Sequence, residues 1–116
     1  MSRTPRSSGR RVGDRFVPRR PLRLGRDAPA KMAARSISAV EVQAILADNV
    51  IVQVIDHRAR FVLLGVAARP LVAVVADDEI NDATVLISVY EPDEEHGWTP
   101  QTIRAILGDD RRKEGP

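Results

Sequence analysis

The first regular pattern of apolar residues along the chain is a helical stripe, and it directly follows a strong signal for the start of a helix. Ser38 and Glu41 stand in the spacing of a capping box, in which each side chain accepts a hydrogen bond from the other residue's backbone N–H. Ile37 and Val42 are placed to form a hydrophobic staple across this start. Together with Ile45 and Leu46, Val42 makes the stripe. The pattern predicts a helix over 39–47 that ends at Asp48-Asn49.

Four runs of β-branched and aliphatic residues follow, and each predicts a strand. The predicted strands are 50–55, 60–66, 71–76 and 84–90. Their short connections favour antiparallel hairpins over crossovers. The third run is apolar at consecutive positions, which is typical of a central strand covered on both faces. Gly65 in the second run indicates a bulge.

Weaker signals predict one helix on each side of these elements. The stretch 27–35 has helix-forming composition, with Asp27 as the cap and Pro29 in the first turn. Thr99-Pro100 marks the start of a last helix, and Gly108 marks its end. We therefore predict an α+β fold with short N-terminal helices, a four-stranded antiparallel sheet and a C-terminal helix. The helices are expected to cover one face of the sheet.

Charge divides the chain into two parts. Residues 1–37 hold ten Arg and one Lys against two Asp, whereas residues 38–116 hold seven basic and fourteen acidic side chains. We predict a disordered basic arm over 1–26, a small domain over 27–108 and a charged tail over 109–116. Opposite charges should draw the arm toward the domain at low salt.

Composition removes several classes of protein. The chain has no cysteine, so it forms neither a disulfide nor a thiolate metal site. No apolar run is long enough to cross a membrane, and no apolar segment follows the basic N-terminus as in a secretory signal. We expect a cytoplasmic protein with no membrane contact, no cofactor and no metal.

Three blocks carry a resemblance to a known family, and they cover a little over half of the chain. They are Lys31–Ser38, Arg69–Ala76 and Ile87–Pro92. Together they resemble the bacterial family known as domain of unknown function 4258, which is similar in layout to small RelE-type and BrnT-type ribonuclease toxins. The resemblance implies an antitoxin or another protein as a partner. Members usually open with His-Ala-x-x-Arg-Met, whereas here Asp27 and Lys31 stand at the His and Arg positions, and Ser36 replaces a Gly.

A ribonuclease needs a proton acceptor and a cation that stabilises the charged phosphate. The residues that would supply this chemistry here are Lys31, Arg58, Arg60, Arg69 and Tyr90. For the three arginines, we favour an alternative interpretation as surface charges that protect sheet edges. Tyr90 would then cap the core, and Trp98 would either anchor the last helix or contact a partner. With so few aromatic residues, the chain offers no stacking platform for single-stranded nucleic acid.

Two histidines offer further chemistry. His57 lies in a predicted turn beside Asp56, which could orient it as a general base, but we favour a solvated turn histidine. His96 follows Asp93, Glu94 and Glu95, and this group could bind a divalent cation. We favour a flexible acidic loop over 91–98 without metal, because neighbouring residues rarely converge on one ion.

The basic arm is a candidate for contact with nucleic acid. Arginines bind phosphate backbones without sequence choice, and salt weakens this binding steeply. The residues we assign to it are Arg10, Arg11, Arg19, Arg20 and Arg23. A basic extension without function is the alternative.

Three functions stay open. The leading hypothesis is a non-enzymatic or degenerate toxin-like protein that acts by contact with protein or RNA. The first alternative is a ribonuclease toxin of a toxin–antitoxin pair. The second is a homodimeric interaction module whose basic arm tethers nucleic acid.

Overall fold

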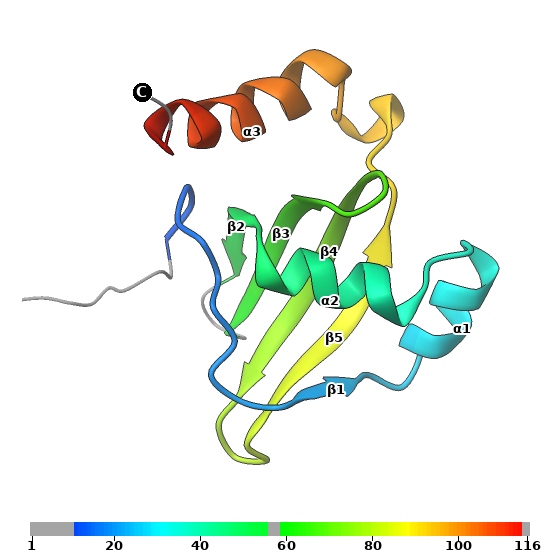
Figure 1. Cartoon of the computed structure of the whole chain (residues 1–116). Coiled ribbons are helices and arrows are strands. Elements are labelled where there is room, and N and C mark those ends of the chain that lie inside the picture. The colour runs from blue at the N-terminus through cyan, green and yellow to red at the C-terminus, as the bar shows by residue number, and fades with distance from the viewer. Residues whose placement is uncertain (1–10, 56–58, 115–116) are drawn as a thin grey trace, which may run out of the picture.

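A five-stranded mixed sheet forms the centre of the protein, with strand order β1-β5-β4-β3-β2 (Figure 1). The computed structural model describes residues 11–55 and 59–114, and the side chains of 11–55 and 59–108. The strands are β1 (Leu22–Leu24), β2 (Val50–Ile55), β3 (Arg60–Val66), β4 (Pro70–Asp78) and β5 (Ala83–Tyr90). The helices are α1 (Ala28–Ala34), α2 (Ala39–Ala47) and α3 (Pro100–Glu114), and a single 3₁₀ turn, η2, spans Glu94–His96.

The α+β class is confirmed, and β2 to β5 form the predicted antiparallel meander with ends within two residues of those expected. The prediction of a four-stranded antiparallel sheet is slightly wrong, because β1 adds a fifth strand that runs parallel to β5. Helix α2 has its predicted bounds and a complete capping box at Ser38 and Glu41. Asp27 precedes α1, but its side chain forms no capping hydrogen bond.

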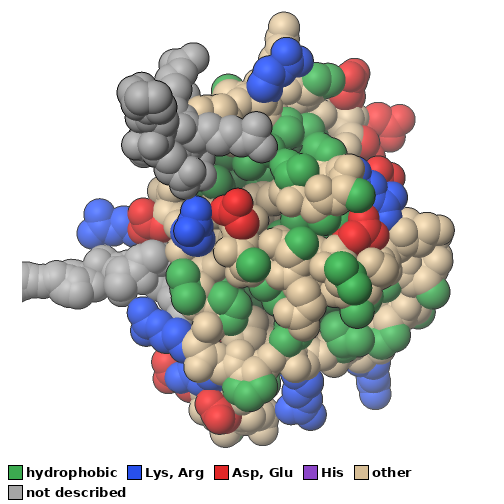
Figure 2. Space-filling view, viewed as in Figure 1, with side chains coloured by type: hydrophobic (Ala, Val, Ile, Leu, Met, Phe, Trp, Pro, Cys, Tyr) green, Lys and Arg blue, Asp and Glu red, His purple; other side chains and the backbone are tan. Residues whose placement is uncertain are grey.

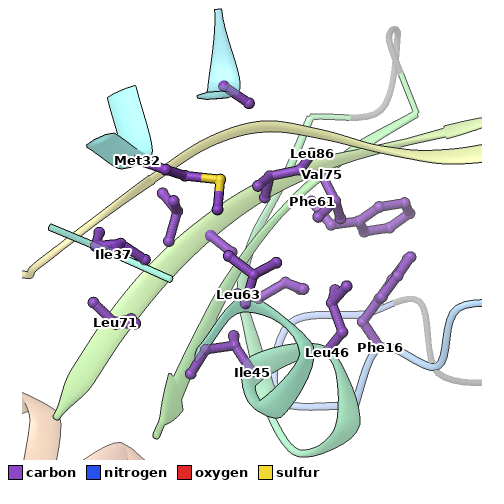
Figure 3. Close-up of a cluster of buried hydrophobic side chains, with 14 of the residues drawn as sticks. Phe16, Met32, Ile37, Ile45, Leu46, Phe61, Leu63, Leu71, Val75 and Leu86 are labelled. Atoms are coloured by element: carbon purple, nitrogen blue, oxygen red, sulfur yellow. The ribbon is translucent and has the colours of Figure 1, made fainter. Parts of the chain in front are cut away.

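One face of the sheet, which we call the front face, carries α1 and α2. Figure 1 shows α2 lying across it, and Figure 3 shows the side chains that meet there. Ile45 from α2 and Leu63, Leu71 and Leu86 from three strands are fully buried in this cluster, and Met32 of α1 joins them. Burial of aliphatic side chains on this scale is the main source of stability in so small a domain.

Residues 11–26 belong to the folded domain, and the prediction that they are disordered is wrong. Phe16 is only 1% exposed and packs against Phe61, with ring centroids 5.1 Å apart. The buried Asn49 side chain accepts a hydrogen bond from the Phe16 backbone N–H and donates one to its carbonyl. Phe16 and Leu22 look isolated in the sequence because their partners lie more than 30 residues away. Residues 1–10, including Arg10, lie outside the described part of the chain.

Gly65 allows α2 to approach the sheet and does not form the predicted bulge. A Cβ atom there would lie 2.7 Å from the Asp48 carbonyl oxygen and 2.9 Å from Ile45. The register shifts in the meander fall elsewhere, between Ile51 and Gln53 and beside Val74–Val75.

Helix α3 covers part of the opposite, back face, so the helices do not all cover one face as predicted. Ile103, Ile106 and Leu107 pack against a second cluster made by Val62, Leu64 and Val72. Central strand β4 is therefore covered on both faces, as expected. Thr99 caps α3 by accepting the backbone N–H of Thr102. The helix continues through Gly108 to Glu114, so the prediction of a separate tail from residue 109 is wrong up to that point.

Candidate functional site

A groove of about 1010 Å³ lies on the back face, between the sheet and α3. Strands β2, β3 and β5 form its floor, while η2 and the first turns of α3 form its wall. Its polar lining includes Gln53, Ser88 and Thr102, and its apolar lining includes Val62 and Ile106. A concave site that mixes apolar walls with a few convergent polar groups is typical of ligand binding. No helix in the described residues is long and apolar enough to cross a membrane.

Bulges in two strands shape the floor of this groove. In β2 the pairing with β3 jumps from Ile51 to Gln53, and both Val52 and Gln53 then line the groove. In β5 the pairing with β4 jumps from Leu86 to Ser88. Such bulges change the direction of nearby side chains, while the hydrogen bonds between the strands are preserved elsewhere. Polar Gln53 and Ser88 thereby reach a face that β3 and β4 keep apolar.

The wall of the groove carries an aspartate–histidine pair. The Asp93 Oδ1 atom lies 2.7 Å from His96 Nδ1 and also accepts the His96 backbone N–H. This hydrogen bond raises the pKa of His96 above its ordinary value and lowers the pKa of Asp93. Gly97 adopts a left-handed conformation with φ 90°, which ends η2 and turns the chain toward Trp98. The prediction of an acidic loop at 91–98 therefore underestimates its order.

Arg35 brings a cation to the same groove from the end of α1. One of its terminal nitrogens, Nη1, donates to the Val89 carbonyl at 2.8 Å and to Ser88 Oγ at 3.3 Å. Both acceptors are neutral, and no carboxylate of the described residues forms an ion pair with Arg35. The nearby acids have other partners, because Glu91 pairs with Arg69 and Asp93 with His96. Arg35 is therefore held at this site by neutral acceptors and not by a carboxylate of the described residues.

Two aromatic side chains complete the groove. Tyr90 and Trp98 are half-buried, each packs against the Val62–Leu64–Val72 cluster, and each also lines the groove. Burial raises the pKa of the Tyr90 hydroxyl, which keeps it protonated as a hydrogen-bond donor. The rings cap the second cluster, which agrees with the packing interpretation of both residues, and contact with a ligand or partner stays a prediction.

The described members of the predicted catalytic set do not assemble at one site. Arg69 pairs with Glu41 at 3.0 Å and with Glu91 at 3.5 Å, and it also donates to the Ser36 carbonyl. Arg60 begins β3 at the opposite end of the β3–β4 hairpin from Arg69 and lines a different hollow beside Asp78. Lys31 is half-buried on α1. Of the described members of the set, only Tyr90 lines the groove; Arg58, like His57, lies outside the described residues.

The arginines predicted to bind nucleic acid have separate environments. Arg11, Arg19 and Arg23 are exposed. Arg20 is instead half-buried, with one guanidinium nitrogen 2.6 Å from Asp77 and another 3.4 Å from Asp82 at the β4–β5 hairpin. The expected attraction between the basic segment and the acidic domain is thus present as defined ion pairs. Figure 2 shows basic side chains projecting around the rim of the front face, with acidic side chains among them.

Sequence reasoning did not find Arg35, Gln53 or Ser88 as site residues. Arg35 and Ser88 lie in blocks that carry the family resemblance but are not singled out there, and all three residues reach the groove only through a helix end or a strand bulge. Within the described residues, no group of three or more His, Asp or Glu side chains is placed to hold a metal ion. Comparisons of the chain with protein-family models, with curated proteins and with solved structures return no match.

Proposed function

We propose that the protein acts by binding RNA and does not cleave it. The observation that carries this proposal concerns the basic residues that were predicted to stabilise the phosphate during cleavage. Those that the structure describes lie apart from one another or are neutralised by carboxylates. Arg69 is held by two carboxylates, and Arg60 lies at the far end of its hairpin. A phosphate in the groove would meet Arg35 but neither of these two arginines. Contact with RNA needs cations on the surface and does not need them to converge on one phosphorus atom.

The exposed arginines of the 11–26 segment, which we call the basic rim, support contact with a phosphate backbone. Arg11, Arg19, Arg23 and Arg26 are exposed and lie on a segment that the fold holds in place. A fixed array of guanidinium groups binds phosphate at a smaller entropic cost than a disordered arm. The negative charge of the remaining chain favours this rim as the main contact for the phosphate backbone of the RNA.

Salt-dependent binding of a single-stranded RNA tests the proposal. Replacing Arg11, Arg19, Arg23 and Arg26 with Gln should weaken binding and flatten the plot of log K against log salt by roughly 0.7 for each phosphate that is no longer neutralised. Arg104→Gln, an exposed change on α3, is the matched control. Binding that is absent in the unaltered protein, or that the fourfold variant retains with the same salt slope, contradicts RNA binding through this rim. Deletion of residues 1–26 is not a clean test, because it removes β1 and Phe16 from the fold.

A ribonuclease is the second candidate, and the Asp93–His96 pair favours it. A histidine oriented by a carboxylate can act as a general base toward a ribose hydroxyl, with Tyr90 and Arg35 in the same groove. Induction of the protein in a bacterium, followed by growth and RNA integrity, separates the candidates. Growth arrest with RNA fragmentation that His96→Gln abolishes would establish cleavage. Unchanged growth with intact RNA supports the binding role.

Arg69→Ala is a poor test of cleavage in this protein. Its guanidinium joins the α2 capping box to Glu91 at the end of β5. Loss of function on its removal would follow from a loosened fold as readily as from impaired chemistry. Tyr90→Phe keeps the packed ring and removes only the hydroxyl, so it is the more informative change.

The resemblance to the domain of unknown function 4258 family remains part of the proposal, as a toxin-like protein with an altered opening motif. Ser36, which stands where the family has Gly, has φ 56°. This left-handed region favours glycine, so the position has the backbone demand that the family pattern predicts. A protein partner, either an antitoxin or a second copy of the chain, is tested by size-exclusion chromatography with light scattering. A monomer that binds RNA alone would support the leading proposal.

A further inference from the structure

We infer that the groove on the back face holds one unpaired nucleotide of an RNA strand, with its phosphate on Arg35 and its base against Tyr90 and Trp98. This inference rests on the proposed function, which is RNA binding. It names the groove as the site that takes one nucleotide of the bound RNA. The groove, Arg35 and both aromatic rings lie together on the back face and its edge.

The charge pattern selects an anion. Arg35 is anchored by two neutral oxygens and keeps its other donors for a ligand, while the two acids of the lining are engaged by Arg69 and His96. Guanidinium groups form charge-assisted hydrogen bonds with phosphate oxygens in a fixed planar geometry. His96 provides a second nitrogen, Nε2, on the same wall, because Nδ1 is bound to Asp93.

The aromatic rings select a planar group beside that anion. Tyr90 and Trp98 each bury part of the ring against the second cluster and leave part in the groove. Stacking on such rings is favourable for every base, because each base has a π face. Two rings make no extended platform, so the site suits one base and not a run of bases.

The remaining polar lining suits the edge of a base. Gln53 presents an amide with both donors and an acceptor, and Thr102 presents a hydroxyl that also shares a hydrogen bond with the Thr99 hydroxyl. The groove, at about 1010 Å³, has room for a nucleotide with water around it. Because the groove is open to solvent, the strand can continue on either side of the bound nucleotide.

Titration of the full-length protein with adenosine and guanosine 5′-monophosphates, followed by NMR, tests the inference. We expect saturable shifts of the Trp98 indole and of backbone amides in 88–98. Adenosine without phosphate should bind at least tenfold more weakly, because it cannot form the charge-assisted hydrogen bond to Arg35. Arg35→Met should reduce nucleotide affinity by about the same factor. Arg104→Met, at an exposed position of α3 that does not line the groove, is the matched control and should leave the affinity unchanged.

Because Arg35 also contacts Val89, thermal melting must show that Arg35→Met is folded, and His96→Gln provides a second variant on an exposed side chain. The inference is overturned if no monophosphate gives saturable shifts up to about 10 mM, a very weak affinity. It is also overturned if inorganic phosphate competes but the Trp98 signal never moves. Nucleotide binding without retention of RNA would instead contradict the proposed function and leave the groove site standing. Retention of RNA without nucleotide binding would do the reverse.

Discussion

The two faces of the sheet differ in how completely they are packed. The front face is closed by α1, α2 and the 11–26 segment, and its aliphatic side chains from Leu63, Leu71 and Leu86 are fully buried. The back face has a smaller cluster of Val62, Leu64 and Val72, and the α3 residues over it are only half-buried. Beside that cluster the same face opens into the groove.

This difference shows how a small domain can separate the face that supplies stability from the face that carries the candidate site. A chain of this size has little apolar surface to spare, so one face must be packed completely. The other face can then keep polar side chains and a hollow without unfolding the protein. Each of the following changes tests how far that separation holds.

The largest effect is expected from a cavity in the front face. Leu63→Ala should lower the free energy of unfolding by about 2–5 kcal/mol, because Leu63 is fully buried between α2 and the sheet. Ile106→Ala on the back face should cost only about 1 kcal/mol, since that side chain is half-buried. Urea denaturation followed by circular dichroism measures both. Equal losses would mean that the two faces contribute alike.

Removal of the Asn49 side chain should detach the 11–26 segment from the front face. Asn49→Ala leaves the Phe16 N–H and the Phe16 and Ile45 carbonyls without their side-chain partner. We expect a loss of roughly 1–3 kcal/mol, the cost of unsatisfied buried polar groups. Hydrogen exchange should rise first in residues 13–17. Exchange that rises only with global unfolding would show that the segment and the sheet form one cooperative unit.

An effect of similar size is expected where α2 approaches β3. Gly65→Ala places a Cβ atom 2.7 Å from the Asp48 carbonyl, so α2 must shift, at a cost of about 1–3 kcal/mol. Gly108→Ala is the matched change on the back-face helix, where a Cβ meets nothing within 4 Å. That change should stabilise α3 by about 0.5–1 kcal/mol through helix propensity. Thermal melting of both variants should give shifts of opposite sign.

The smallest effect is the pH response of the groove wall. The folded pKa of His96 is raised by Asp93, so its contribution to stability is complete below the unfolded pKa and is lost as pH rises through the folded pKa. The pKa of Asp93 is lowered, so its contribution is present above the unfolded value and is lost as pH falls through the folded one. NMR titration of the His96 ring should show its pKa falling toward the ordinary value in Asp93→Asn. An unchanged His96 pKa would mean that the pair does not form in solution.

Local patterns in the sequence were sufficient for most of the meander and for α2. The capping box at Ser38 and Glu41 acts within four residues, and β-branched runs favour strands wherever they occur. Local signals of the same kind gave wrong predictions near both ends of the chain. Gly108 resembles a helix stop but continues α3, and the arginine-rich segment resembles disorder although Phe16 is buried.

Only the tertiary structure decided the site. Arg35, Ser88 and His96 come from separate elements, and they share a groove because two bulges turn side chains to the back face while α3 covers only part of it. The sequence by itself determined α2 and the strands of the meander, since caps, turns and side-chain periodicity depend on neighbours along the chain. The pairing of β1 with β5, the burial of Phe16 and the face chosen by α3 depend on contacts between distant residues, which no local pattern encodes.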